Sequence, residues 1–537
     1  MVLVGKRRLK GERSMSVQAH SADVETLHRM GYAQELRRRM SGFSNFAVSF
    51  TIISILSGCL TLYYFGMTNG GPAVITIGWP LVGIMVILVG LAMAEVCSSY
   101  PTAGGLYYWS AKLGGANGAA WSWFTGWFNL LGQVAITAGI DFGLAFFINY
   151  FVSLFDSSWP NPLNASTSLG SRFSIIVIYA VVLFVHGLLN TFGVSLVARL
   201  NDISVWWHIV GVLIIVGVLF LFSKYHQSPS YVFTKFVNLT GFSFAGASTF
   251  VFLTGLLMAQ YTFTGYDASA HMTEETHNAA ISGPRGIVWS IIISLIAGWI
   301  LLIGVTQAIN DADYATAAGA AGAAPAVIFI DAVGKNGAAL LLLIVIGAQF
   351  YCGMSSVTAN SRMIYAFSRD GAVPGSQFWH KVNPRTRTPT NSIWFAAVGA
   401  LILGLPYLWN PTAYAAITSI AVIGLYIAYG IPILLRLLAG SKFQRGPWHL
   451  GRWSALVGWI AVIWIVCITI LFVLPQAAPG NTLATFNFAI VAVAVVLIYS
   501  GGYWFLSAKN WFKGPKVQGT VEELAKIEAE LGGALVS

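Results

Sequence analysis

The sequence FTGYD at residues 263–267 interrupts an apolar segment that extends from about residue 242 to residue 270. A helix interrupted within a membrane leaves backbone N–H and C=O groups without partners, which is tolerated where the backbone lines a cavity or contacts a ligand. A second interruption, SGC at residues 57–59, lies in an apolar segment from about residue 45 to residue 67. Paired interruptions of this kind indicate the binding site of a transporter.

The whole chain has the composition of a membrane protein. Of its 537 residues, 56% are hydrophobic and 9% are charged, whereas soluble domains carry about 25% charged residues. About twelve apolar segments approach the ~20 residues that cross a bilayer. The first 43 residues are polar, so we expect no signal peptide. The composition therefore predicts an integral, multi-pass protein with the lipid bilayer as its partner, placed in the plasma membrane.

The net charge of +10 is unevenly distributed along the chain. Lys and Arg are concentrated in residues 6–39, 362–387, 436–452 and 509–526, and they are rare in the loops expected on the opposite side. This is the positive-inside pattern. It predicts an even number of spans with both termini in the cytoplasm, and it explains the basic charge without a nucleic-acid partner.

We expect a single membrane domain between two tails. The expected divisions are a basic N-terminal tail at 1–43, a twelve-helix domain at 44–510 with repeats at about 44–223 and 242–438 and peripheral helices at about 453–508, and a C-terminal tail at 511–537. Residues 31–39 are predicted to form a short amphipathic helix on the membrane surface. The aromatic loop at 98–109 is predicted to pack against the bundle as part of a gate.

Further motifs occur in a fixed order along the chain. They are AEVCSSYPTAGG (94–105), EETHN (274–278), GPR (283–285), RMIYAFSRDGAVP (362–374) and GPWHLG (446–451). Together with FTGYD, the first four resemble the amino acid–polyamine–organocation superfamily. The last resembles its amino acid/choline transporter branch, which includes GABA permeases. The resemblance covers about residues 30–515.

The resemblance implies a leucine-transporter-type fold, with two inverted repeats of five helices, breaks in helices 1 and 6, and two peripheral helices. It also implies alternating access driven by an ion gradient, often of protons. One departure concerns the first break, where many members have Gly-x-Gly and this chain has Ser57-Gly58-Cys59.

A broken helix also suggests how a substrate is held. N–H groups at the start of its second half favour a carboxylate, and carbonyls at the end of its first half favour an ammonium group. The candidate carboxylate ligands are Ser57, Gly58 and Cys59. The candidate amine ligands are Phe263, Thr264 and Gly265, with Phe263 or Tyr266 closing over the substrate. The alternative for Gly58 and Gly265 is close helix packing.

Five polar residues within or near the apolar segments are candidates for ion coupling or for pairing with substrate charge. They are Asp141, His208, Asp267, Ser355 and Ser356. An ionisable group at membrane depth is costly and indicates function, and imidazole titrates near neutral pH. The alternatives are a hydrated position for Asp141, an interfacial His208, a cap or ion pair for Asp267, and inter-helix hydrogen bonds for the two serines.

Charged residues near the expected cytoplasmic surface are candidates for an inner gate. They are Glu95, Glu274 and Glu275, with Arg285 and Arg362 as partners. Ion pairs between them that break on opening would form the gate. The alternative is that all five are simply solvated.

The sequence favours a secondary active transporter of amino acids or related amines such as GABA, coupled to protons or sodium. The alternatives of the same fold are an amine, choline or polyamine permease and an amino acid exchanger. A non-transporting nutrient sensor is an alternative of a different class. We expect no enzyme activity, cofactor or metal site, because the histidines and cysteines are scattered and no ATP-binding Gly-rich loop is present.

Overall fold

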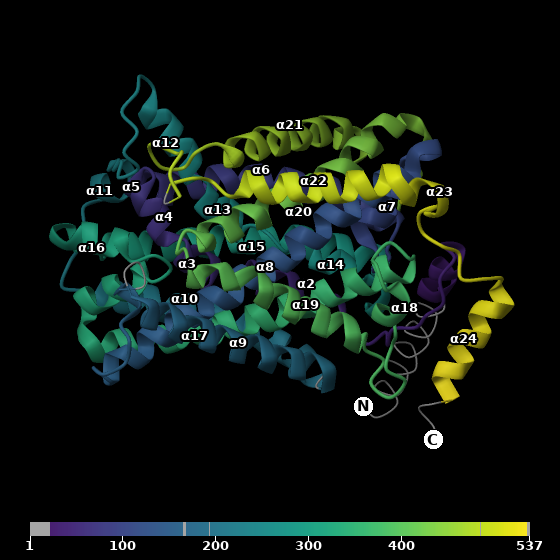
Figure 1. Ribbon diagram of the computed structural model, residues 1–537, viewed down its shortest axis with the longest axis horizontal. Helices are drawn as coiled ribbons and strands as arrows, with labels where there is room; N and C mark the ends of the chain where they lie inside the picture. The colour runs from purple at the N-terminus through teal and green to yellow at the C-terminus, as the bar shows by residue number, and fades with distance from the viewer. Residues whose placement is uncertain (1–21, 165–167, 193, 484, 534–537) are drawn as a thin grey trace, which may run out of the picture.

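The computed structural model describes residues 22–164, 168–192, 194–483 and 485–533. The remaining parts of the two expected tails, residues 1–21 and 534–537, lie outside the described residues. Within the described ranges the regular structure is helical, with two isolated bridges between extended residues. The long helices lie side by side along the molecule (Figure 1). Residues 22–40 and α24 (Val521–Gly533) lie at the same end of this bundle, which we name the terminal end.

Eleven of the described helical segments are long and apolar enough to cross a membrane. The helices that form them are α2 (Gly42–Ile53) with α3 (Gly58–Thr61), α6 (Trp79–Ser99), α8 (Gly118–Phe155), α9 (Leu169–Phe192), α10 (Val194–Phe222), α15 (Ala279–Gln307), α17 (Ala324–Arg369), α19 (Thr390–Gly404), α20 (Ala413–Ala439), α21 (Ser454–Val473) and α22 (Ala489–Tyr503).

The remaining crossing is the interrupted segment at FTGYD. It consists of α12 (Ala247–Gly255), α13 (Leu257–Thr262) and α14 (Ala268–His271). None of these pieces is long enough to span a bilayer alone, since a span needs about 20 residues. Together with the eleven long segments, it accounts for the twelve expected crossings.

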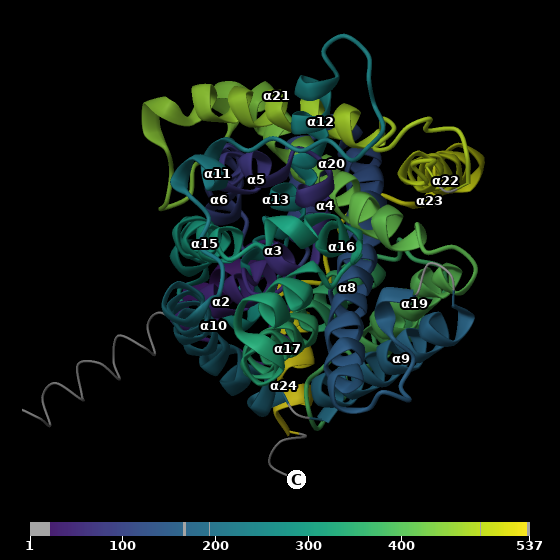
Figure 2. The same ribbon diagram turned by 90° about the vertical axis from the view of Figure 1, so that its left-hand side faces the viewer.

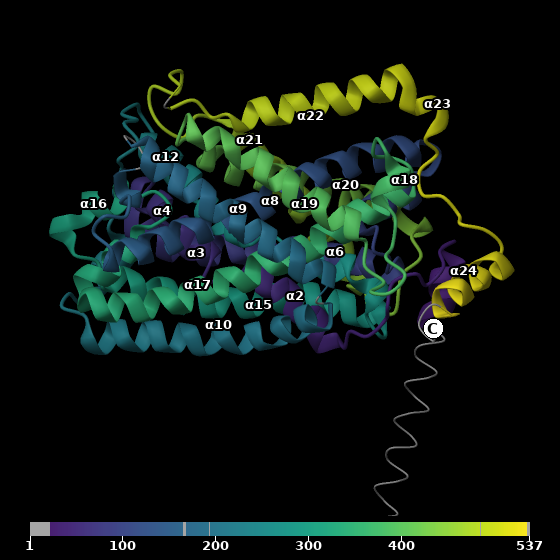
Figure 3. The same cartoon turned by 60° about the horizontal axis from the view of Figure 1, so that its bottom comes forward.

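The two last crossings lie on the outside of the bundle. Helix α21 runs along the upper edge of the bundle in Figure 1, and α22 runs along the upper edge in Figure 3. The most apolar window of α22 is 11% buried and that of α21 is 28% buried, whereas the windows containing α2 and α8 are each 83% buried. Such unburied apolar faces belong against lipid. The interior is therefore formed by the earlier helices, with α3, α4 and α13 near α8 when the bundle is viewed from the opposite end (Figure 2).

Shorter helices cover the two ends of the bundle. At the end opposite the termini lie α4 (Tyr63–Thr68), α5 (Gly71–Ala73), α11 (Pro229–Thr234) and α16 (Tyr314–Gly319), and at the terminal end lie α7 (Gly105–Leu113), α18 (Ser376–Trp379) and α23 (Lys509–Trp511). The surface helix α24 begins with reciprocal bonds between Thr520 and Glu523, which form a capping box.

The segment at residues 31–39 is not the predicted surface helix. It is an extended chain that runs beneath the terminal end, and Tyr32, Ala33 and Leu36 are completely buried. Its backbone is held by other segments, because Arg39 and Met40 donate to the Glu275 carbonyl at 2.9 and 2.8 Å. The apolar residues that suggested a membrane-facing stripe instead pack against protein.

Candidate functional site

The first interrupted helix breaks at Ser54–Ser57, three residues before the predicted position. The left-handed residue is Ser54, with φ 38°, and not a glycine. Its carbonyl accepts hydrogen bonds from the N–H groups of Ser57 and Gly58, each at 2.8 Å. Its hydroxyl lies 2.7 Å from His208 Nε2. The side chain thus supports a conformation that Ser rarely adopts, and α3 begins at Gly58.

Gly58 is required at its position for packing. A Cβ atom added there would lie 2.7 Å from Thr262 Cγ2 on α13. The N–H groups in the first turn of α3, which include that of Cys59, have no acceptor within the helix. The candidate carboxylate ligands Ser57, Gly58 and Cys59 are all buried at the start of α3, and Gly58 faces Thr262 on the second broken helix.

The second break occupies residues 263–267, where the sequence predicts it. Gly265 has φ 85°, and an added Cβ atom would lie 2.1 Å from Ile52 Cγ2. The Phe263 carbonyl accepts a hydrogen bond from Tyr426 OH at 2.8 Å, so this candidate amine ligand already has one partner. The Thr264 hydroxyl donates to the Tyr261 carbonyl at 2.6 Å.

The two candidate lids lie in different surroundings. The Phe263 ring stacks on Trp79 with 4.3 Å between centroids. The Tyr266 ring lies 5.1 Å from that of Tyr429. The hydroxyl of Tyr266 is buried and has no hydrogen-bond partner of good geometry among the described residues. Of the two, only Tyr266 carries a polar group that could contact a solute, and its hydroxyl lies close to that of Tyr426.

Several buried polar atoms gather around the two breaks without partners among the described residues. They are the side-chain N and O of Gln260 and the hydroxyls of Tyr261 and Tyr266. Buried polar groups in proteins are nearly always hydrogen-bonded, and exceptions call for an explanation such as a ligand. The sequence analysis missed Gln260 and Tyr261, although both immediately precede the FTGYD motif.

Asp267 is buried, and its carboxylate contacts residues of three helices. Its carboxylate accepts hydrogen bonds from Gln133 Nε2 and Tyr429 OH, each at 2.8 Å. His271 Nε2 lies 3.3 Å away. These contacts link α14 to α8 and α20. Of the two alternatives considered for Asp267, a cap and a pair with a basic loop residue, the first fits by position. Asp267 is the N-cap residue of α14, although its side chain makes no capping bond.

The other coupling candidates have distinct partners. Ser355 donates to Asn201 Oδ1 at 2.5 Å, and Ser356 shares a 2.8 Å bond with Thr137. Both serines therefore join neighbouring helices and do not contact the first broken helix through these bonds. The carbonyl of Ile52 instead accepts from Cys352 Sγ at 3.2 Å.

The two remaining candidates, His208 and Asp141, are both completely buried. His208 lies between Ser54 and the Ser204 carbonyl, which is 2.7 Å from its Nδ1. Asp141 is paired with His186, whose Nδ1 lies 3.2 Å from the carboxylate. The sequence analysis missed His186, although a histidine within an apolar segment is itself a signal of function.

The acidic gate candidates form ion pairs at the terminal end. Glu274 pairs with Arg369 at 3.4 Å, Glu275 with Arg362 at 2.7 Å, and Glu95 with Arg436 at 3.0 Å. Arg285 is exposed and takes no part in these three pairs. Solvation, the alternative considered for these acids, does not fit groups that are buried. Arg369 and Arg436 were missed, because their partners are distant in the sequence.

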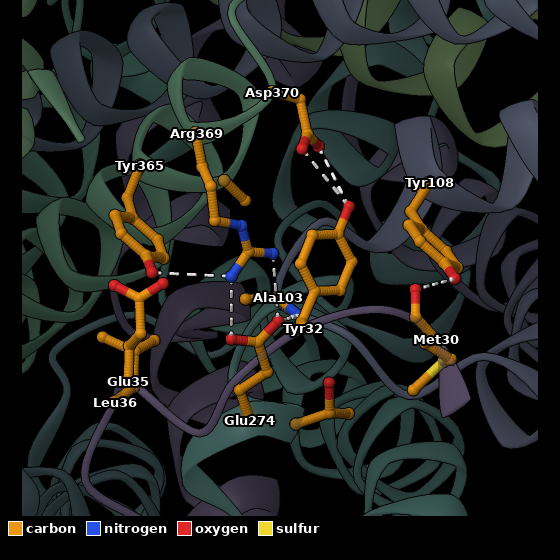
Figure 4. A network of polar contacts seen from close by, with 12 residues as sticks. Met30, Tyr32, Glu35, Leu36, Ala103, Tyr108, Glu274, Tyr365, Arg369 and Asp370 are labelled. Atoms are coloured by element: carbon orange, nitrogen blue, oxygen red, sulfur yellow. Dashed lines mark hydrogen bonds and ion pairs between the residues drawn. The ribbon is translucent and has the colours of Figure 1, made fainter. Parts of the chain in front are cut away.

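The N-terminal segment completes the network at the terminal end (Figure 4). The Arg369 guanidinium lies 3.8 Å from the centre of the Tyr32 ring, and Tyr32 OH donates to Asp370 at 3.1 Å. Burial raises the pKa of the Tyr32 hydroxyl well above its usual value, and the Asp370 charge raises it further. The backbone N–H of Ala103, in the aromatic loop, donates to Glu274 at 2.9 Å. The predicted packing of this loop is confirmed.

Two cavities lie at opposite ends of the bundle. One, of about 460 Å³, lies at the terminal end and is lined among others by Arg39, Asn190, Thr358 and Arg362. The other, of about 300 Å³, lies at the opposite end and includes Tyr64 at the end of the first broken helix. The breaks and the unpartnered polar groups lie between these cavities.

Comparison with known proteins supports one family. The family model described as "Amino acid permease" matches residues 40–498. The chain is 45% identical to amino-acid permease BAT1 of Arabidopsis thaliana over 94% of this chain and 98% of that protein. It is 45% identical to the BAT1 homolog of Oryza sativa over 91% and 94% of the two chains. It is 32% identical to the GABA-specific permease of Saccharomyces cerevisiae over 92% and 86% of the two chains.

Proposed function

Because this chain belongs to the amino acid permease family, we propose that it moves an amino acid or a related amine such as GABA by alternating access, with an ion gradient as the driving force. At the coarser level, the chain is an integral, multi-pass membrane protein and a transporter of amino acids or amines. The choice of substrate, the coupling ion and the site residues belong to the proposal.

The observation that carries the proposal is the meeting of two broken helices. The first turn of α3 faces α13, and Gly265 lies against Ile52. This arrangement supports binding of a carboxylate at the start of α3, where the N–H of Cys59 has no acceptor within the helix, since helix N-termini favour anions. Ser57 and Gly58 lie beside it, and their own N–H groups already donate to the Ser54 carbonyl. The carbonyls of Phe263, Thr264 and Gly265 would accept from the ammonium group. A solute with both charges fits this pair of breaks.

The buried polar side chains beside the breaks suggest how specificity arises. Gln260 and Tyr266 have unpartnered polar atoms and lie near Tyr426. A polar solute between them would satisfy these atoms, and an apolar solute of the same size would not. We therefore expect selection for hydrogen-bonding amino acids or amines.

The ion pairs at the terminal end support its role as the inner gate. Glu274–Arg369 and Glu275–Arg362 join the chain just after the second break to α17. The positive-inside pattern assigns this end, with both termini, to the cytoplasm. We propose that these pairs separate when substrate is released there, in the plasma membrane.

Proton coupling fits the candidate ion sites better than sodium coupling does. Sodium would need several oxygen ligands together, but Ser355 and Ser356 point to different helices. Asp141, His186 and His208 are buried titratable groups close to the first break. We therefore propose a proton symporter.

An uptake assay tests this function. Purified chain in proteoliposomes should accumulate at least one of radiolabelled GABA, alanine, glutamate or lysine under an inward proton gradient. A protonophore should abolish accumulation, and replacement of sodium by potassium should leave it unchanged. Absence of uptake for all four probes would contradict the proposal. Binding of a probe without uptake would instead indicate a nutrient sensor.

A further inference from the structure

The buried pair of Asp141 on α8 and His186 on α9 has an unusual set of contacts. His186 Nδ1 lies 3.2 Å from both carboxylate oxygens. With Nδ1–H donating to Asp141, the lone pair of His186 Nε2 remains available for a proton. Neither that nitrogen nor Asp141 Oδ1 has a hydrogen-bond partner of good geometry among the described residues.

Asp141 is held against α17 by Gly353. A Cβ atom added to Gly353 would lie 1.8 Å from Asp141 Oδ1 and 2.7 Å from the His186 ring. No residue with a side chain fits at position 353 without displacing the pair. The His186 ring also packs edge-on against Phe350, with 4.7 Å between ring centres. Three helices therefore fix the carboxylate and the imidazole relative to each other.

The pair lies directly behind the first break. Cys352, the neighbour of Gly353, interacts electrostatically with Asp141 and donates to the Ile52 carbonyl. Tyr261, which precedes the second break, also interacts with Asp141. Residues that contact or belong to both broken helices therefore lie close to the pair.

The other titratable groups facing the pair are neutral phenols and a thiol. Tyr179 on α9, Tyr261 on α13 and Cys352 on α17 interact with Asp141. Tyr414 on α20 donates to the carbonyl of Gly139, two residues before Asp141 on α8. Among the described residues no Lys or Arg forms an ion pair with Asp141. A proton on the imidazole is therefore what neutralises this carboxylate, and its loss leaves a net negative charge in a low-dielectric interior.

A route for the proton reaches toward the pair from the terminal end. Asn190 and Thr358 line the 460 Å³ cavity. Asn190 lies one turn, about 5.4 Å, beyond His186 on α9 and donates to the His186 carbonyl at 3.0 Å. It also accepts from Thr358 at 2.5 Å. Asn190 and Thr358 thus join the lining of this cavity to the backbone of the helical turn that carries His186.

We propose that Asp141 and His186 together form the proton-binding site that couples substrate movement to the proton gradient. The proposal deepens the proposed function and rests on it. A proton from the outer solution adds to His186 Nε2 and makes the pair neutral. A neutral pair costs less to bury in the closed bundle than a net charge does. After the inner gate opens, the proton passes to water in the terminal-end cavity. His208 is less suited, because its hydrogen bonds are to Ser54 and Ser204 and no carboxylate accompanies it.

The test compares accumulation with exchange in proteoliposomes that contain the full chain. The probe is whichever of radiolabelled GABA, alanine, glutamate or lysine the wild type accumulates best. With one proton per substrate, an inward gradient of one pH unit should give about tenfold accumulation. Asp141→Asn and His186→Gln should reduce this ratio to about one, while exchange against unlabelled probe inside the vesicles continues. Asp141→Glu should restore gradient-driven accumulation.

The matched control is His380→Gln. His380 lies in a loop at the terminal end and bonds to the Ser376 carbonyl at 2.6 Å, so its replacement should leave accumulation unchanged. Size-exclusion profiles identify any variant that misfolds. The proposal would be overturned if both Asp141→Asn and His186→Gln retained accumulation. It would also be overturned if both variants were well folded but lost exchange, because the pair would then be needed for substrate binding. Failure of the wild type to move any probe would instead contradict the proposed function itself.

Discussion

Gly265 illustrates what a single residue contributes to the site. Its φ of 85° lies in the left-handed region, and its Cα hydrogens face Ile52 on the other broken helix. A side chain would be excluded on both grounds, because a Cβ atom disfavours this conformation and because there is no space for it. The break and the contact between the two helices thus depend on one glycine.

Gly265→Ala should therefore lower both stability and uptake. The left-handed conformation costs a residue with a Cβ atom about 1–2 kcal/mol, and overpacking against Ile52 costs about 1–3 kcal/mol more. Gly246→Ala is the matched control, since Gly246 has φ 86° and an added Cβ atom would have no neighbour within 4 Å. Thermal melting should show a larger loss for Gly265→Ala, and only this variant should lose uptake. Equal losses would contradict the packing argument.

Asp370 should make the proposed inner gate sensitive to pH. Burial raises the pKa of its carboxyl, while Arg369 and the hydrogen bonds from Tyr107, Lys516 and Tyr32 lower it, and the net shift is upward from 3.8. An open gate would hydrate the carboxyl and return its pKa to the usual value. The closed gate then binds the proton more tightly, so closure is favoured as pH falls through the raised pKa and is weakened as pH rises through it.

Hydrogen exchange of residues 31–40, corrected for intrinsic rates, measures this effect. Protection should be greater near pH 5 than near pH 7, and Asp370→Asn should remove the difference because that side chain does not titrate in this range. The same protection at both pH values in the wild type would contradict the assignment.

The sequence analysis located the second break correctly and the first one approximately. FTGYD contains the glycine that takes the left-handed conformation, so the motif and the geometry coincide. At the first break the left-handed residue is Ser54, which is stabilised by His208 from another helix. That contact joins residues 154 positions apart and leaves no local signal.

At the level of elements, the proposed gate is an ion-pair network between the chain just after the second break and α17. Acids just after the second break were predicted to form a gate, but their partners were predicted only in part. Arg362 was identified as a partner, whereas Arg369 and Arg436 were not, and Arg285 is exposed. The distribution of charged residues along the sequence predicts which of them lie at the terminal end. Which arginine pairs with which acid depends on how α17 and α20 pack, and the sequence does not show this.

Arg369→Gln should loosen the closed gate. It leaves Glu274 buried without its cation, and removal of one partner of a buried pair costs about 3–5 kcal/mol. The residue 31–40 segment should then exchange hydrogen faster. The double variant Glu274→Gln/Arg369→Gln should regain part of the loss, since no uncompensated charge remains.

The exposed pair Lys235–Asp311 at the opposite end provides the control. Asp311 is 49% exposed, so Asp311→Asn should change stability by less than about 1 kcal/mol. A double variant no more stable than Arg369→Gln would show that the guanidinium acts through its contact with Tyr32 and not through Glu274.

In the whole molecule, the two tails meet beneath the terminal end. The N–H of Gln518 donates to the Gly31 carbonyl at 2.8 Å, and Ala33 donates to the Gln518 side chain at 2.7 Å. Glu528 on α24 accepts from Gln34 at 2.6 Å and lies 2.7 Å from His28. Composition predicted a basic N-terminal tail and a C-terminal tail but gave no indication that they bind each other, because these contacts span nearly the full length of the chain.

Truncation after residue 515 should release the N-terminal segment without disturbing the membrane helices. Residues 31–36 should lose protection from hydrogen exchange, and efflux of preloaded probe should accelerate. The thermal unfolding of the helical bundle should change little. Truncation after residue 533 is the control and should behave as wild type, because it retains α24. Unchanged protection in the shorter chain would show that α17 alone holds the segment.

The joining of the tails has a consequence for biosynthesis. The N-terminal segment leaves the ribosome first, but it acquires its bonds to Gln518 and Glu528 only after almost the entire chain has been translated. During insertion of the helices, the terminal end therefore lacks these contacts, and a chain ended by a stop codon before residue 516 would never form them. A newly made chain that lacks its last residues would therefore expose its N-terminal segment, and this exposure would distinguish it from the complete chain.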